Sequence, residues 1–207
     1  MYLSRVAIDV KKYESMKALY NQEILHGMIE SSFLGERQRN LWRLDHLLGE
    51  KYLLVLSNTP PQNNTLPEQI GYENSVWETK QYDSLLERIT EGSRWYFRLT
   101  ANPTIAEHVE GKKRGKVKAI TVVHKQREWL TRTSAKKGFF VQESQFDVVQ
   151  SEWRTIKKEG KEIQILAVTF EGILNVTNAE VFRQTLISGI GREKAYGMGL
   201  LTVVPYV

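Results

Sequence analysis

The sequence contains no cysteine among its 207 residues. Disulfides, thiolate metal sites and cysteine nucleophiles are therefore excluded. No stretch approaches the roughly 18 consecutive apolar residues that a membrane span requires. The first ten residues, MYLSRVAIDV, alternate like a strand and lack the apolar core and cleavage site of a secretory signal. Together these absences predict a cytoplasmic protein.

Acidic residues are nearly absent from one long segment. Residues 111–137 contain ten Lys or Arg side chains and a single acid, Glu128. The net charge of the chain is +5, yet residues 1–87 carry 9 basic against 12 acidic side chains. The positive excess therefore lies in the second half. A solvated face is the ordinary reason for a run of charge, but this length with one acid favours a polyanionic partner.

The first half of the chain is predicted to have the order β-α-β-β-(α)-β. Its first strand places Val6, Ile8 and Val10 on one face. Apolar residues at helical spacing, from Met16 to Met28, predict one helix over 14–32. Two strands follow around the Gly-Glu turn at 49–50, then a loop rich in proline and asparagine, and residues 75–89 close this half.

The second half repeats this order. Residues 93–104 alternate as a strand, and the basic segment carries a helix near 125–137. Residues 146–176 read as two long strands joined at the turn KKEGK. A helix that begins at the N-cap Asn178 and a last strand from residue 200 complete the chain. The fold class is therefore α+β, with two tandem ferredoxin-like β-α-β-β-α-β domains over 1–90 and 91–207.

A glycine-rich loop spans residues 189–199 and reads GIGREKAYGMG. In dinucleotide-binding and P-loop motifs the glycines follow a strand and open a helix, whereas here a helix enters them and a strand leaves them. A helix C-terminus explains Gly189 or Gly191, but not Gly197 and Gly199. A mobile backbone that bears Arg192 and Lys194 suits contact with a phosphodiester chain.

The loop and four further stretches resemble one family. The loop GIGREKAYGMGLLTV is similar to the glycine-rich loop of the repeat-associated RNA-binding (RAMP) superfamily. The stretches MYLSRV, LWRLD, YFRLTANPT and VTFEGILNV, in this order, narrow the resemblance to the CasE family of CRISPR-associated endoribonucleases. The resemblance covers nearly the whole chain. It implies metal-independent cleavage of a CRISPR repeat hairpin at the 3′ base of its stem, with no cofactor, and assembly with other Cascade subunits.

Histidine suits proton transfer near neutral pH, and the chain has four: His26, His46, His108 and His124. The resemblance implies that His26 is catalytic, because family members carry their catalytic histidine at this position of the first helix. It also places Lys194 at a lysine of the glycine-loop pattern, as a catalytic cation. The family often has a tyrosine three residues before the histidine, where this chain has Glu23; Tyr20 is the nearest tyrosine. Whether Glu23 or Tyr20 replaces it stays open.

Further cations are predicted to hold the phosphates of an RNA stem, because the deep, narrow major groove of A-form RNA favours recognition by shape and backbone. The predicted RNA-binding residues lie in the basic segment, its helix, the KKEGK turn and the glycine loop: Lys112, Lys113, Arg114, Lys116, Lys118, Arg127, Arg132, Lys157, Lys158, Lys161, Gly189, Gly191, Arg192, Gly197 and Gly199. No histidine or carboxylate spacing matches a metal site, so none is predicted.

Two other functions remain open from the residues. A non-catalytic RAMP-type RNA-binding subunit would share the glycine loop and the basic face, and the Glu23 departure favours it. A double-stranded DNA binder would share the basic face alone.

Overall fold

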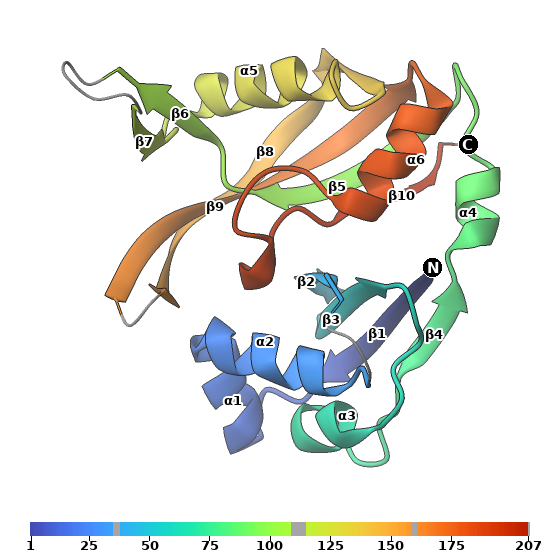
Figure 1. Ribbon diagram of the computed structural model, residues 1–207, viewed down its shortest axis with the longest axis vertical. Helices are drawn as coiled ribbons and strands as arrows, with labels where there is room; N and C mark the ends of the chain where they lie inside the picture. Colours follow the sequence, from blue (N-terminus) through green and yellow to red (C-terminus); the bar gives the residue numbers. More distant parts are fainter. Residues whose placement is uncertain (35–37, 109–114, 159–160, 207) are drawn as a thin grey trace.

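The structure is a computed structural model that describes residues 1–34, 38–108, 115–158 and 161–206. Figure 1 shows two antiparallel sheets, one from each half of the chain, packed face to face with helices on their outer sides. The first sheet has the order β2-β3-β1-β4. Its elements are β1 (Tyr2–Ile8), α1 (Tyr13–Tyr20), α2 (Gln22–Ser31), β2 (Leu41–Leu47), β3 (Glu50–Ser57), α3 (Thr65–Ile70) and β4 (Glu78–Gln81), followed by α4 (Asp83–Glu87).

The second sheet has the order β10-β5-β9-β8. Its elements are β5 (Arg94–Ala101), α5 (Val123–Ser134), β8 (Phe139–Lys158), β9 (Lys161–Val176), α6 (Ala179–Ser188) and β10 (Leu201–Pro205). In both sheets the first strand of the half lies between the third and the fourth, with the second strand at the edge. This shared arrangement confirms the tandem ferredoxin-like fold, whereas the boundary at residue 90 stays a prediction.

Two details of the first half differ from the sequence prediction. The predicted helix over 14–32 is two helices, because Asn21 is extended (φ −117°, ψ 96°) and its side chain accepts a hydrogen bond from the backbone N–H of Glu23 (3.1 Å). Asn21 thereby caps α2. Met16 and Tyr20, predicted to lie on the apolar side of the helix, are exposed on α1, at 53% and 92%. The first strand likewise ends at Ile8, and Val10 is exposed in the turn that follows Asp9.

A two-stranded ribbon in the second half was missed. It consists of β6 (Thr104–Glu107) and β7 (Lys116–Ala119), paired antiparallel, and it lies between β5 and α5 in the chain. Its strands are short and exposed, so they carry little of the alternation by which a strand is recognised. Figure 1 shows the ribbon projecting from the second domain.

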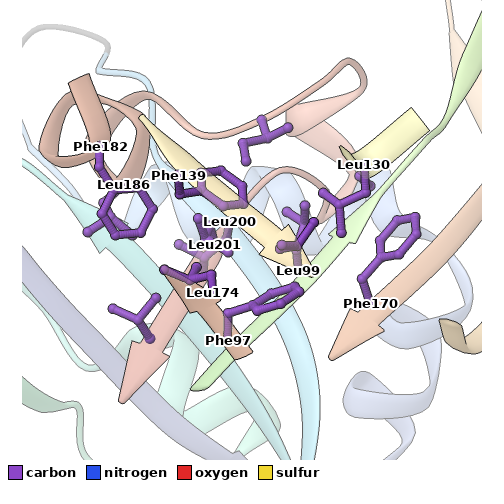
Figure 2. Packing of buried hydrophobic residues seen from close by; sticks show 14 of the residues in the cluster. Phe97, Leu99, Leu130, Phe139, Phe170, Leu174, Phe182, Leu186, Leu200 and Leu201 are labelled. Atoms are coloured by element: carbon purple, nitrogen blue, oxygen red, sulfur yellow. The ribbon is translucent and has the colours of Figure 1, made fainter. Parts of the chain in front are cut away.

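The core of the second domain lies between its sheet and the helices α5 and α6. Figure 2 shows Phe182 and Leu186 of α6 beside Phe139 of β8. The rings of Phe139 and Phe182 have their centroids 5.3 Å apart. Leu41 of β2 and Leu56 of β3 belong to the same cluster, although they come from the first domain. The two domains therefore share apolar packing.

A buried arginine joins the two sheets. Arg43 of β2 is 2% exposed, and its Nε and Nη2 donate to the two carboxylate oxygens of Asp45, both at 2.7 Å. The remaining donors reach the second domain: Nη1 bonds the carbonyls of Arg98 (2.9 Å) and Leu200 (2.7 Å), and Nη2 bonds Thr202 Oγ1 (2.7 Å). A guanidinium has five N–H donors, so Arg43 is fully satisfied. This cluster, Arg43 with Asp45, Arg98, Leu200 and Thr202, is called the Arg43 clamp below.

We predict that Arg43→Met lowers the free energy of unfolding by about 3 kcal/mol or more, because among the described residues it leaves the buried Asp45 carboxylate with Arg98 as its one ion-pair partner, at 3.5 Å. The matched control is Arg5→Met, since Arg5 makes an exposed ion pair with Glu78 (2.8 Å) that contributes about 1 kcal/mol or less. Urea denaturation followed by circular dichroism measures both. Equal losses from the two substitutions would contradict the clamp's structural role.

Candidate functional site

A pocket of about 710 Å³ lies between α2, the residues just before β2, and the glycine loop. The loop contains η1 (Lys194–Tyr196), a short 3₁₀ turn that Figure 1 shows pointing toward α2 and β2. Residues from both domains line the pocket: His26, Glu30, Gln38, Arg39, Asn40, Gly191, Arg192, Glu193, Lys194 and Ala195. The two residues predicted to be catalytic, His26 and Lys194, therefore meet in one cavity.

The fold of α2 places His26 at the pocket wall. Leu25 and Ile29 are fully buried against the first sheet, and His26 lies at the edge of that buried face, half-buried. Its Nδ1 is buried and has no hydrogen-bond partner among the described residues. The other ring nitrogen, Nε2, is therefore the one available to a substrate in the pocket.

Backbone conformation requires glycine at all four glycine positions of the loop, and close packing also requires it at Gly197 and Gly199. All four have positive φ, from 72° at Gly189 to 88° at Gly199. A Cβ on Gly197 would lie 2.6 Å from the Trp42 ring, and one on Gly199 would lie 2.7 Å from the Ile190 carbonyl. Gly197 and Gly199, which a helix C-terminus does not explain, thus have a structural reason in these close contacts. Their contact with RNA stays a prediction.

Lys194 is half-buried at the start of η1. Burial lowers the pKa of its ammonium group, and the neighbouring positive charges of Arg39 and Lys137 lower the pKa further. A half-buried ammonium group beside other positive charges is destabilised unless an anion binds next to it. The pocket is thus suited to a negatively charged group beside Lys194.

Arg39 is a pocket residue that sequence reasoning missed. It is exposed and lies two residues after the undescribed segment 35–37, directly before Asn40 and β2. The side-chain amide of Asn40 donates to Glu30 Oε1 (3.3 Å), which ties this segment to α2. Nothing in the local sequence distinguishes Arg39 from other surface arginines, because its proximity to Lys194 arises only when the two domains pack.

Neither candidate for the family tyrosine lines this pocket. Glu23 is exposed in the first turn of α2, and no bond joins it to His26 in the described part of the chain. Tyr20 ends α1 and borders a separate cavity of about 430 Å³, with Asn21, Thr155 and Glu162. A proton-transfer role for either residue finds no support in this geometry.

Comparison with known proteins decides the family. The chain matches the family described as CRISPR associated protein over residues 1–205. It is 31% identical to the CRISPR-associated endoribonuclease Cse3 of Thermus thermophilus, covering 99% of this chain and 100% of Cse3. The chain belongs to the Cse3/CasE family of CRISPR-associated proteins. The Cascade subunit CasE of Escherichia coli is 30% identical over 63% of this chain and 66% of CasE.

Solved structures of the Cse3/CasE family share the fold. Thermus thermophilus Cse3, bound to an RNA representing a pre-cleavage complex, superimposes with a TM-score of 0.82 at 25% identity, covering 99% of this chain and 98% of Cse3. Cas6e of Escherichia coli K-12 has a TM-score of 0.70 at 24% identity, with both chains fully covered. The fold of the family is therefore retained across the whole chain.

The predicted RNA-binding cations of this Cse3/CasE family member lie in several separate parts of the chain. Lys112, Lys113 and Arg114 lie outside the described residues. Lys116 and Lys118 are exposed on β7, where Lys118 pairs with Glu107 (2.5 Å). Arg192 is exposed in the glycine loop at the pocket.

The remaining cations lie on α5 and the β8–β9 hairpin. Arg132 is exposed on α5, but Arg127 is held by the fold: it donates to the Glu143 carbonyl, lies 3.6 Å from Asp147, and covers the Phe146 ring at 5.2 Å. Lys161 is exposed at the start of β9. Lys157 and Lys158 end β8, and their side chains lie outside the described part. RNA contact by all of these cations stays a prediction.

Within the described ranges, no group of three or more His, Asp or Glu side chains could hold a metal ion. In the same ranges, no helix is long and apolar enough to span a membrane.

We predict that Lys194→Met makes the RNA-free protein more stable than wild type at pH 7. The pKa of Lys194 is lower in the fold than in the unfolded chain, so between the two values the unfolded chain binds more protons and wild-type stability rises with pH. The advantage of the variant should shrink as the pH approaches about 10.4, the ordinary lysine pKa.

Urea denaturation at pH 7 and at about pH 9.5 measures this advantage. Lys161→Met is the control, since Lys161 is exposed and its stability difference from wild type should stay level with pH. An advantage of Lys194→Met that grew with pH would contradict the account.

Proposed function

We propose that this protein is an endoribonuclease that cuts precursor CRISPR RNA at the 3′ base of the repeat hairpin. The single observation that carries the proposal is the pocket in which His26 of the first domain faces Lys194 of the second. The Cse3/CasE relatives support it, since one is named an endoribonuclease and has been solved with an RNA in a pre-cleavage complex.

The chemistry uses groups that the pocket supplies. The ribose 2′-oxygen attacks the adjacent phosphorus, the P–O5′ bond breaks, and the products carry a 2′,3′-cyclic phosphate and a 5′-hydroxyl. One proton leaves the 2′-hydroxyl and one reaches the 5′-oxygen, and His26 Nε2 transfers one of them. The half-buried ammonium of Lys194 stabilises the negative charge that develops on the phosphate oxygens. None of these steps uses a metal or other cofactor.

The RNA stem would be held by cations beyond the pocket. Lys116 and Lys118 on β7, Arg132 on α5 and Lys161 on the hairpin are exposed cations of the second domain. Contacts of this kind are made to phosphates, so they read shape and charge rather than sequence, and affinity should fall with salt. We further propose that the protein enters a Cascade complex, as the relative named a Cascade subunit does, and acts in the cytoplasm, where its RNA is transcribed.

A non-catalytic RNA-binding subunit is the second candidate. The departure at Glu23 favours it, because no tyrosine lines the pocket among the described residues. Such a subunit would bind the hairpin and leave it intact. A double-stranded DNA binder would prefer duplex DNA to the RNA hairpin.

We predict that His26→Ala lowers the single-turnover cleavage rate by about 10²–10⁴-fold and leaves hairpin affinity within about threefold of wild type. Cleavage of an end-labelled repeat hairpin is followed in EDTA, and the product ends are identified. His46→Ala is the control, since His46 is exposed on β2 and does not line the pocket. Tight binding by wild type with no cut would support the non-catalytic subunit instead.

A further inference from the structure

Two cations from different domains face one cavity without an ion pair. Arg39 and Lys194 both line the pocket, and neither forms a salt bridge or a side-chain hydrogen bond with any described residue. The two carboxylates of the pocket, Glu30 and Glu193, have other partners; Glu30 accepts from Asn40. The pocket thus presents positive charge that the described fold does not neutralise.

The fold holds these cations close to each other. Asn40, bonded to Glu30, fixes the backbone next to Arg39 against α2. Two residues further on, the Trp42 ring packs under Gly197 so tightly that a Cβ there would lie 2.6 Å from it. The segment of Arg39 and the loop of Lys194 are therefore pressed together. Their proximity also appears in the lowered pKa of Lys194, to which Arg39 contributes.

We propose that Arg39 is a further catalytic residue, which binds the non-bridging oxygens of the scissile phosphate together with Lys194. This inference rests on the proposed endoribonuclease function. A guanidinium presents a planar fork of N–H donors that matches two phosphate oxygens, whereas an ammonium acts as a point charge. As the 2′-oxygen adds to phosphorus, negative charge gathers on those oxygens, and the two cations stabilise it.

The arrangement divides the chemistry between the domains. The first domain supplies the proton-transfer group, His26, and one cation, Arg39; the second supplies Lys194. The repulsion between Arg39 and Lys194 disfavours the empty pocket and is relieved when a phosphate lies between them. The pocket is thereby organised for an anion before RNA arrives.

The test compares Arg39→Gln and Arg39→Lys with wild type, and Arg5→Gln is the matched control. Arg5 is an exposed arginine of the first domain that pairs with Glu78 and does not line the pocket. Single-turnover cleavage of the repeat hairpin is measured across pH, and affinity is measured with a hairpin whose scissile nucleotide is 2′-deoxy and cannot be cut.

We expect Arg39→Gln to slow cleavage by about 10²–10³-fold, with affinity for the 2′-deoxy hairpin reduced by less than about tenfold. Arg39→Lys should recover part of the rate, and Arg5→Gln should match wild type within about twofold. A rate loss for Arg39→Gln no larger than that of Arg5→Gln, or one fully matched by lost affinity, would overturn the catalytic assignment.

The pH dependence of cleavage distinguishes a catalytic role from a structural one, because general loss of structure would not shift the pH at which activity is lost. Because Arg39 lowers the pKa of Lys194, its removal raises that pKa, and the alkaline loss of activity should shift to higher pH in Arg39→Gln. The other ionisable groups around Lys194 are unchanged in this variant: His26, Glu30, Lys137, Arg192 and Glu193. An alkaline limb that stayed in place would contradict a direct contact of both cations with the same phosphate.

Inorganic phosphate separates this inference from the proposed function. At constant ionic strength, phosphate should raise the melting temperature of wild type but not of Arg39→Gln. If wild type binds phosphate through Arg39 yet cuts no RNA, the anion site stands and the endoribonuclease function fails. If phosphate stabilises both proteins equally or neither, the anion site fails.

Discussion

The Arg43 clamp is the interaction on which the site depends. Arg43 projects from β2 of the first sheet and pairs with Asp45 of its own strand. Its other N–H groups donate to backbone carbonyls of β5 and of Leu200, just before β10, and to the Thr202 hydroxyl. Burying a guanidinium is costly unless each donor is satisfied, so a packing of the two sheets that broke these bonds would be destabilised. The pocket is formed by residues of both domains, so its shape depends on how the two sheets pack.

The glycine loop packs against the same strand, β2, and this packing positions the loop in the site. The loop enters from α6 at Gly189, where a Cβ would lie 2.9 Å from Leu41, and it crosses Trp42 at Gly197. Leu41 and Trp42 are the residues just before Arg43 on β2, so the strand that anchors the clamp also supports the loop. Lys194 is thereby held over α2 and His26. The charge in the pocket is then a consequence of packing, since Lys194 and Arg39 approach one another only in the assembled pair of domains.

Much of the fold could be predicted because it rests on local patterns. Alternation in β1 and β5, together with turn chemistry, predicted the order of elements in both halves, and the sheets confirm it. The break at Asn21 was missed because the apolar spacing continues through it, while its effect depends on one side-chain cap. The pairing of β6 with β7 was missed because both strands are short and exposed.

Only part of the site could be predicted from the sequence. His26 and Lys194 followed from the resemblance to the CasE family, and the pocket brings them together. Arg39 could not be predicted as a site residue, because it is distinguished only by its proximity to Lys194 of the other domain. The structural reason for Gly197 and Gly199 could not be predicted either, because the ring of Trp42 and the Ile190 carbonyl, which exclude a side chain there, are contacts that no sequence pattern displays.

The most direct test of the central claim is a crystal structure of this protein with a repeat hairpin whose scissile nucleotide is 2′-deoxy. The account predicts that the scissile phosphate lies in the pocket between the domains, with His26 Nε2 near the 2′ position and Lys194 within contact of a phosphate oxygen. An RNA bound on the β6–β7 and α5 face, with its scissile phosphate remote from an empty pocket, would contradict it.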